Sequence, residues 1–132
     1  MAIDHVSVGV TNMKRSKAFY DAALAPLGMA PVYPVEIHGQ LVGVGYGTPD
    51  KLSFWIQLPI NGQPASMGNG VHIAFRAEKR AAVDAFFLAA LDQGGTEDGR
   101  PGLRTEYHPD YYGAFVRDPD GNKIEACSHG HE

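Results

Sequence analysis

An internal repeat constrains this 132-residue chain more than any other feature of its sequence. The segment that begins at His5 aligns without a gap on the segment that begins at His72, at a constant offset of 67 residues. Self-similarity at a fixed period marks a chain built from copies of one supersecondary unit. The matched residues are those that a strand and an amphipathic helix use for packing: Ala18 with Ala85, Phe19 with Phe86, Tyr20 with Phe87, Ala23 with Ala90, Leu24 with Leu91 and Gly28 with Gly95.

Each repeat predicts one strand, one helix and then three more strands. In the first half, residues 2–10 alternate and are rich in valine, which is typical of a strand. Asn12 can cap a helix that begins near Met13, and Gly28 can end it. Strand-like runs follow over 31–37, 41–47 and 51–58.

The second half repeats this order after a Gly-, Asn-, Pro- and Ser-rich linker over residues 60–70. Residues 71–77 predict a strand, and residues 79–93 predict a helix that Gly94 and Gly95 end. Three further strands are expected near 103–107 and over 112–118 and 122–128. Asp118-Pro119-Asp120-Gly121 predicts the tight hairpin between the last two strands.

These elements predict an α+β fold of two tandem βαβββ modules, which form a curled mixed sheet around a cavity. We expect one domain over 1–128, with the first module at about 1–59, the second at about 71–128, and a tail over 129–132. Each sheet buries one face under its helix, and the other face needs a cover. The simplest cover is the sister sheet, and that arrangement encloses a cavity.

Composition excludes several function classes. The net charge is −4 and the sequence pI is about 5.8, so no basic stripe is present to neutralise a nucleic-acid backbone. No apolar run approaches the roughly 20 residues that a membrane span requires. The opening MAIDHVSVGV lacks the pattern of a signal peptide. Because Cys127 is the only cysteine, no intrachain disulfide can form, and we expect a reducing, cytoplasmic location.

Strand parity directs two histidines and a carboxylate toward the cavity. Alternate side chains of a strand point to opposite faces, and the apolar set belongs under the helix. In the first strand, His5 opposes the valines and so faces the cavity. His72 does the same in the repeat-equivalent strand, and Glu125 opposes the apolar residues of the last strand.

Gln57 is a fourth candidate on the same kind of face. Ile56-Gln57-Leu58 aligns with Ile124-Glu125-Ala126 at an offset of 68 after a one-residue slip, which pairs Gln57 with Glu125. Two imidazoles and a carboxylate that converge in a cavity suit a divalent transition metal. Such a site leaves coordination positions open for substrate or water. We therefore expect His5, His72 and Glu125 to be metal ligands, with Gln57 either a ligand or a hydrogen-bond partner of a metal-bound water.

The paired modules and four segments, IDHVSVGV, RSKAFYDAAL, GVHIAF and DPDGNKIEA, resemble the vicinal oxygen chelate superfamily. This superfamily includes glyoxalase I, methylmalonyl-CoA epimerase, fosfomycin- and bleomycin-resistance proteins and extradiol dioxygenases. The resemblance covers about residues 1–128. The stretch HPDYYGAFVRDPDGNKIEA also resembles single-domain members whose substrates are not established.

The resemblance implies a glyoxalase-like fold with metal-ligand slots at His5, Gln57, His72 and Glu125. It implies a divalent ion such as zinc, nickel, cobalt, manganese or iron, and a homodimer. Glyoxalase I members commonly have a glutamate where this chain has Gln57. Since an amide cannot act as a base, Glu125 alone would carry the proton transfer. The expected activity is that of a metal-dependent isomerase or lyase, acting on a small oxygen-chelating substrate through an enediolate-type intermediate.

Further residues are candidates for the substrate pocket. Ser7 and Trp55 lie on cavity-facing positions, although Trp55 also suits a core. The aromatic and imidazole groups of His108, Tyr111 and Tyr112 could form a mouth over the cavity, and the alternative is a turn followed by strand aromatics. Cys127 fits an inert buried thiol.

A second class of function stays open from the sequence. A homodimeric cavity that binds a small molecule, either metal-free or with the help of a metal, as in bleomycin or fosfomycin resistance, fits the same fold. An extradiol dioxygenase fits less well, because those enzymes usually duplicate the fold again. The partner that we expect in either case is a small molecule.

Overall fold

The computed structural model describes residues 2–132 and contains two βαβββ modules in series, as the repeat predicts. The first module consists of β1 (Val6–Gly9), α1 (Met13–Leu24), the short 3-10 helix η1 (Ala25–Leu27), β2 (Ala30–Ile37), β3 (Gln40–Thr48) and β4 (Lys51–Gln57). The second module consists of β5 (His72–Arg76), α2 (Arg80–Asp92), β6 (Thr96–Leu103), β7 (Tyr112–Arg117) and β8 (Lys123–Ser128).

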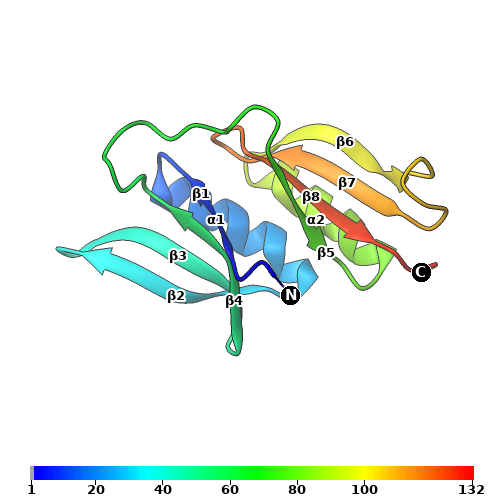
Figure 1. Ribbon diagram of the computed structural model, residues 1–132, viewed down its shortest axis with the longest axis horizontal. Coiled ribbons are helices and arrows are strands. Elements are labelled where there is room, and N and C mark those ends of the chain that lie inside the picture. The colour runs from blue at the N-terminus through cyan, green and yellow to red at the C-terminus, as the bar shows by residue number, and fades with distance from the viewer. Residues whose placement is uncertain (1) are drawn as a thin grey trace.

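Each module forms its own four-stranded mixed sheet. The strand orders are β1-β4-β3-β2 and β5-β8-β7-β6, so the two sheets have the same topology. In each sheet only the pair that contains the first strand, β1 with β4 and β5 with β8, is parallel. The sheets curl without closing, and both helices lie on the same side of them, where α1 and α2 contact each other (Figure 1). The predicted α+β fold is confirmed.

Strand parity follows the sequence prediction. Phe54 and Ile56 of β4 are buried on the helix side of the first sheet, and Ile124 and Ala126 of β8 are buried on the helix side of the second. These residues share one core with the inward faces of α1 and α2. The alternate residues of each strand therefore lie on the opposite side of each sheet, which we call its open face.

Local signals in the sequence mark element boundaries, although α1 ends at Leu24 and η1 continues it to the expected stop at Gly28. The Asn12 side chain accepts a hydrogen bond from the backbone N–H of Arg15 at 3.0 Å, which caps α1. Gly28 adopts a φ of 78° directly after η1. In the turn between β7 and β8, the N–H of Gly121 donates to the carbonyl of Asp118 at 2.9 Å.

The β7–β8 turn also fastens the second module to the first. The Tyr20 hydroxyl on α1 donates to Asp118 Oδ2 at 2.6 Å, and Asn122 Nδ2 donates to the carbonyl of Gly9 at 3.0 Å. Asp118 additionally accepts from backbone and side-chain N–H groups within the turn. A buried carboxylate with this many donors is satisfied rather than available for chemistry. Beside it, the rings of Phe54 and Phe75 pack edge to face at 5.1 Å between centroids.

One strand lies at a different place from the prediction. The sequence predicts a strand near 103–107, whereas β6 spans Thr96–Leu103. Its sequence TEDGRPGL shows no apolar alternation, because β6 is an edge strand that pairs only with β7. Its pairing shifts register around Gly99, which further obscures the period of two.

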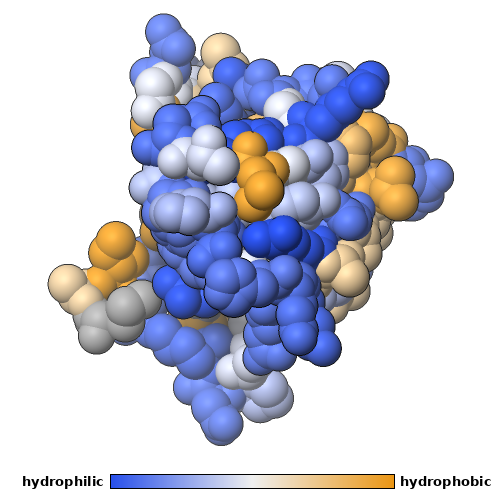
Figure 2. Space-filling model, turned by 90° about the vertical axis from the view of Figure 1, so that its right-hand side faces the viewer, coloured by the Kyte–Doolittle hydropathy of each residue, from blue (hydrophilic) through white to orange (hydrophobic). Residues whose placement is uncertain are grey.

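The two sheets of one chain do not cover each other. They lie side by side, and no strand of one sheet pairs with a strand of the other within residues 2–132 (Figure 1). The sequence leaves open whether the two sheets around a cavity belong to one chain or to two, and within a single chain the sister sheet does not provide the cover. At the end of the molecule that the second module forms, hydrophilic residues dominate the surface (Figure 2). None of the helices in the described part of the chain is long and apolar enough to span a membrane.

Candidate functional site

Glu125 lies at the centre of the open face of the second sheet. It belongs to the run KIEACS in β8, in which its neighbours Ile124 and Ala126 pack in the core on the helix side. Ala74 of β5 lies opposite it on one side and Phe115 of β7 on the other. Only 2% of Glu125 is exposed, so its carboxylate requires partners.

Both oxygens of the Glu125 carboxylate have a partner. The Tyr111 hydroxyl donates to Oε2, and Nε2 of His72 lies 3.1 Å from Oε1. The His72 side chain is 45% exposed, so the pair opens to solvent on the imidazole side. Burial, followed by the hydrogen bond to Glu125, raises the pKa of Tyr111 well above its usual value. Tyr111 therefore remains protonated across the neutral range and keeps its hydrogen on Oε2.

Cys127 lies two residues beyond Glu125 on the same face. It is 7% exposed, and burial raises the pKa of its thiol above the usual range. The nearby Glu125 carboxylate adds to this increase, whereas Tyr111 and Arg76 oppose it. A protonated, buried thiol is a poor nucleophile, in line with the inert role that the sequence predicts.

In the first module, the two candidate ligands lie far apart along the strands. The imidazole of His5 is half-exposed and pairs with the Asp4 carboxylate at 2.7 Å. Gln57 lies at the far end of the β1–β4 pair, where it is opposite Gly9. Four residues of strand separate the levels of His5 and Gln57, which is roughly 13 Å.

The predicted pairing of Gln57 with Glu125 is wrong. The N–H of Val10 donates to the carbonyl of Gln57 at 2.9 Å, and the repeat-equivalent N–H of Ala77 donates to that of Cys127 at 2.7 Å. The structural counterpart of Gln57 is therefore Cys127, at an offset of 70 rather than 68. Sequence alignment missed this because the loops between the helix and last strand differ in length in the two repeats.

Trp55 is the true counterpart of Glu125. Trp55 lies opposite Gly45 in the first sheet, as Glu125 lies opposite Phe115 in the second. A Cβ on Gly45 would come within 2.7 Å of the Trp55 ring, so the missing side chain makes room for the indole. The site position that holds a carboxylate in one module thus holds an aromatic ring in the other.

Trp55 and Gln57 line a cavity with a volume of about 860 Å³. The cavity lies on the open face of the first sheet, and the segment from Leu58 to Ala65 forms one wall. The residues that give it its apolar character include Val35, Ile37, Val42, Leu58 and Ile60. Two of the expected pocket and ligand residues therefore meet here, away from His72 and Glu125.

The other expected pocket residues are dispersed. Ser7 lines a small separate pocket between the modules, beside Asn122 and Lys123. Nε2 of His108 lies 2.6 Å from Nδ1 of His129, beyond Tyr111 on the second sheet. Tyr112 is on the opposite face, where its hydroxyl donates to Asp84 of α2 at 2.6 Å. The expectation that Tyr112 faces the cavity is wrong, since it shares the parity of the apolar residues of β7.

The metal-ligand set is incomplete within one chain. Among residues 2–132, no three His, Cys, Asp or Glu side chains converge on one point as a metal-binding group. His72 and Glu125 do fit as two neighbouring ligands. Donor atoms 3.1 Å apart match two ligands that each lie about 2.1 Å from a shared cation.

The family model of the Glyoxalase/Bleomycin resistance protein/Dioxygenase superfamily matches residues 2–126 of the chain. The chain belongs to this superfamily. A solved glyoxalase/bleomycin resistance protein from Albidiferax ferrireducens T118 is 41% identical, with 97% of this chain and 99% of that chain covered and a TM-score of 0.85. No curated protein matches the chain.

More distant superfamily structures share the fold. Glyoxalase I from Zea mays is 22% identical, with a TM-score of 0.73 and coverage of 96% of this chain and 45% of that one. A glyoxalase-related enzyme from Fulvimarina pelagi is 18% identical, with a TM-score of 0.71 and coverage of 97% and 88%. Superfamily membership confirms the resemblance drawn from the sequence, and it leaves the reaction open.

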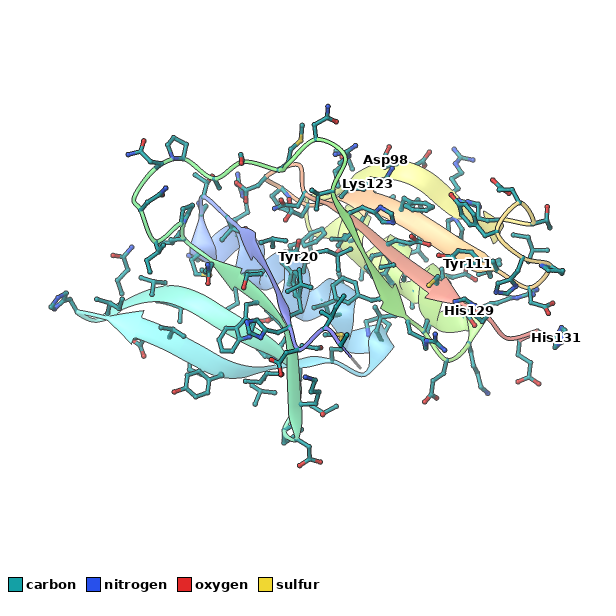
Figure 3. The ribbon with its side chains drawn as sticks, viewed as in Figure 1. Tyr20, Asp98, Tyr111, Lys123, His129 and His131 are labelled. Atoms are coloured by element: carbon teal, nitrogen blue, oxygen red, sulfur yellow. The ribbon has the colours of Figure 1, made fainter. Side chains whose placement is uncertain are left out.

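Three residues of this chain share the open face with Glu125, although the sequence did not identify them as candidate site residues. They are Phe115, Lys123 and Arg104. Strand parity could have identified Phe115 and Lys123. Lys123 is two residues before Glu125 in β8 and so points to the same face, and Phe115 is the cross-strand partner of Glu125 in β7. Arg104 lies just after β6, the strand that the sequence places wrongly. Figure 3 shows Lys123 beside Asp98 at one end of this sheet and Tyr111 beside His129 toward the other.

Proposed function

We propose that this chain is a glyoxalase-type isomerase or lyase that moves a proton on a small substrate with adjacent oxygen atoms. The observation that carries the proposal is the buried Glu125 carboxylate, held on Oε2 by Tyr111 and facing His72 through Oε1. Membership of the superfamily supports this reaction class.

Glu125 is the group that accepts and returns the proton. Because Tyr111 donates to Oε2, Oε1 is the oxygen that can take either a cation or the substrate proton. Oε1 is also the oxygen that faces the half-exposed His72, so this side of the carboxylate is the one that is open to a substrate. Tyr111 thus fixes the orientation of the Glu125 carboxylate, and exposure on the His72 side makes Oε1 the oxygen that reacts.

His72 and Glu125 would hold a divalent metal ion as one half of its ligand set. When bound, the ion would act as a Lewis acid that stabilises negative charge on the substrate oxygens. The fit rests on the 3.1 Å separation of the two donor atoms and on their imidazole and carboxylate chemistry. We assign His5 as a third ligand. Gln57 contacts substrate rather than metal in this proposal, because it lines the cavity and lies far from the level of His5.

A second copy of the chain would bring His5 to the His72–Glu125 pair. The open faces of both sheets lack a cover within one chain, and the first carries exposed apolar side chains, including Tyr33 and Ile37. If the first sheet of one copy covers the second sheet of another, His5 and the 860 Å³ cavity face Glu125. We therefore propose a homodimer with two such composite sites.

The proposal is tested by proton exchange. The protein, purified without an affinity tag, is assayed with nickel, cobalt, zinc or manganese against thiol adducts of 2-oxoaldehydes and acyl-CoA esters. The readout is solvent deuterium that enters the reacting carbon. Glu125→Gln should lower exchange roughly 100-fold or more, since the amide can still contact a cation but cannot take a proton. Glu97→Gln, an exposed position on β6, is the matched control.

Two outcomes contradict this proposal. If Glu125→Gln exchanges as fast as the parent protein, then Glu125 is not the base. If no compound is turned over with any of the four metals, the metal-free binding protein becomes the better hypothesis.

The second candidate function is a metal-free small-molecule binding or resistance protein. The observation that favours it is the apolar cavity of about 860 Å³ next to Trp55. Trp55 is the only tryptophan of the chain, so its fluorescence reports directly on this cavity. Saturable quenching by apolar planar compounds, unchanged after metal removal and in Glu125→Gln, would support this function. Quenching that requires metal would count against it.

A further inference from the structure

Three basic side chains surround the ring of Phe115 on the open face of the second sheet. Nζ of Lys123 lies 5.1 Å from the ring centroid, and Cζ of Arg104 lies 5.6 Å from it. The imidazole centroid of His72 lies 5.9 Å from the same point, in an edge-on arrangement. Phe115 is directly opposite Glu125 in the sheet, so all three basic groups border the proposed proton-transfer site.

Arg104 is held in place on this face. Its Nη2 donates to the carbonyl of Arg100 at 2.6 Å, and its guanidinium lies over two glycines of β6. A Cβ added to Gly99 or Gly102 would come within 3.4 or 3.2 Å of a guanidinium nitrogen, so the glycines make room for it. The residue is half-buried, which restricts the positions that the guanidinium can sample.

No carboxylate of the described residues pairs with Arg104. Asp98 accepts from Arg117 at 3.0 Å and also lies 3.6 Å from Lys123, so one acid serves two cations. The Glu125 carboxylate is occupied by His72 and Tyr111. Among the described residues Arg104 therefore lacks a counter-charge, whereas Lys123 shares Asp98 with Arg117. A half-buried, fixed guanidinium without an anion is arranged to receive one.

We propose that Arg104 is the centre of an anion-binding subsite on the face that carries Glu125, with Lys123 as a second positive charge near the same ring, and that the substrate carries a carboxylate or phosphate group. The guanidinium offers two parallel N–H donors to an oxyanion, and the Lys123 ammonium adds a second charge. Both cations lie within 5.6 Å of the centroid of the Phe115 ring, and Phe115 is opposite Glu125 in the sheet. The inference rests on the proposed function, because it assigns the substrate class of the same site.

The test uses the full-length protein labelled with ¹⁵N, without any assumption about the substrate. Inorganic phosphate, malonate and uncharged glycerol are titrated while the Nε–Hε signals of the arginines and the backbone amides are followed by NMR. Phosphate and malonate should shift the Arg104 signal in a saturable way, and glycerol should not. The apparent affinity should fall with added sodium chloride. Phosphate outcompeting malonate would identify a phosphate ester as the substrate class, and the reverse would identify a carboxylate.

Arg104→Gln should weaken phosphate or malonate binding roughly tenfold or more, because a charge-assisted, paired contact is lost. Arg100→Gln is the matched control: Arg100 is the exposed arginine of β6 that pairs with Glu97, and its loss should leave binding unchanged. Arg104→Lys retains the charge and tests whether the paired N–H groups matter. If Arg104→Gln does not fold, Arg104→Lys and Lys123→Gln provide the same comparison.

The inference is overturned if neither anion shifts the Arg104 signal, or if Arg100→Gln weakens binding as much as Arg104→Gln. It is also overturned if binding follows metal content rather than the Arg104 substitution. Failure of the proposed function gives a different result. In that case Glu125→Gln still binds phosphate or malonate, and no variant exchanges a substrate proton. Exchange that continues without anion binding leaves the proposed function standing and removes only the subsite.

Discussion

Trp55 and Glu125 occupy equivalent positions in the two modules, each opposite a β3- or β7-strand residue at the centre of an open sheet face. The facing residue is Gly45 for Trp55 and Phe115 for Glu125. Each module thus has one large aromatic ring at this level, contributed by different strands. The duplicated unit has diverged, so that one face carries an apolar cavity and the other a buried carboxylate.

Because the two modules have diverged, their open faces differ in chemistry. A symmetric pair of half-sites would place ionisable groups on both faces. Here the second module has the buried Glu125 carboxylate and the basic side chains near Phe115, and the first has the cavity and His5. The two faces are complementary in chemistry, which is the property that two copies need in order to form a composite site.

We expect His72→Ala and His5→Ala each to abolish stoichiometric metal binding while the protein stays folded. Both imidazoles are half-exposed and lie outside the helix-packed core, so their loss removes a donor without creating a cavity. Elemental analysis and circular dichroism measure the two effects. His38→Ala, in the exposed β2–β3 turn, is the control. Parental metal content in both variants would refute the ligand assignment, and unfolding would make the histidines structural.

Light scattering coupled to size exclusion should show a dimer at micromolar protein concentration. The physical reason is the apolar open face of the first sheet, which water contacts in a single chain. Ile37→Lys places a charge on this face and should shift the protein toward monomer, whereas Leu88→Lys, an exposed position on α2, should not. A parent protein that is monomeric under these conditions would rule out the composite site.

Asp118→Ala should lower the free energy of unfolding by about 3 kcal/mol, which corresponds to a drop in Tm of roughly 10 °C. The substitution leaves the buried Tyr20 hydroxyl without its acceptor. It also removes the side-chain hydrogen bonds that hold the β7–β8 turn, which fastens the second module to the first. Chemical denaturation measures the change. Asp50→Ala in the exposed β3–β4 turn should alter stability by less than about 0.5 kcal/mol. Equal losses in the two variants would show that the junction does not depend on Asp118.

Cys127 should be unreactive toward a thiol reagent at pH 8 in the native protein, because its raised pKa keeps it protonated. The folded state retains this proton more tightly than the unfolded chain. Its contribution to stability is therefore complete below the unfolded pKa near 9 and is lost as pH rises through the higher folded pKa. Glu125→Gln removes a negative charge that raises this pKa, so Cys127 should react at lower pH in that variant. Fast labelling of the parent at pH 8 would contradict the burial argument.

The sequence predicted the larger part of the fold from particular residues. Alternation in IDHVSVGV and KIEACS placed His5 and Glu125 opposite the apolar faces, and Asn12 caps the start of α1 as expected. Gly28, expected to end that helix, instead follows the short η1 that extends it. These signals are local, because a strand period and a helix cap each depend on a few neighbouring residues. The edge strand β6 escaped prediction because only one of its sides pairs and neither of its faces is fully buried.

The sequence by itself determined the two βαβββ modules, the resemblance to the superfamily and the sheet faces on which His5, His72 and Glu125 lie. Only the tertiary structure decided that Trp55 rather than Gln57 corresponds to Glu125, that Tyr111 fixes this carboxylate, and that Arg104 lies beside Phe115. The register of one strand against another depends on loop lengths and on hydrogen bonds between distant residues. Local periodicity carries no record of those contacts, since a shift of two residues leaves every side chain on the same face.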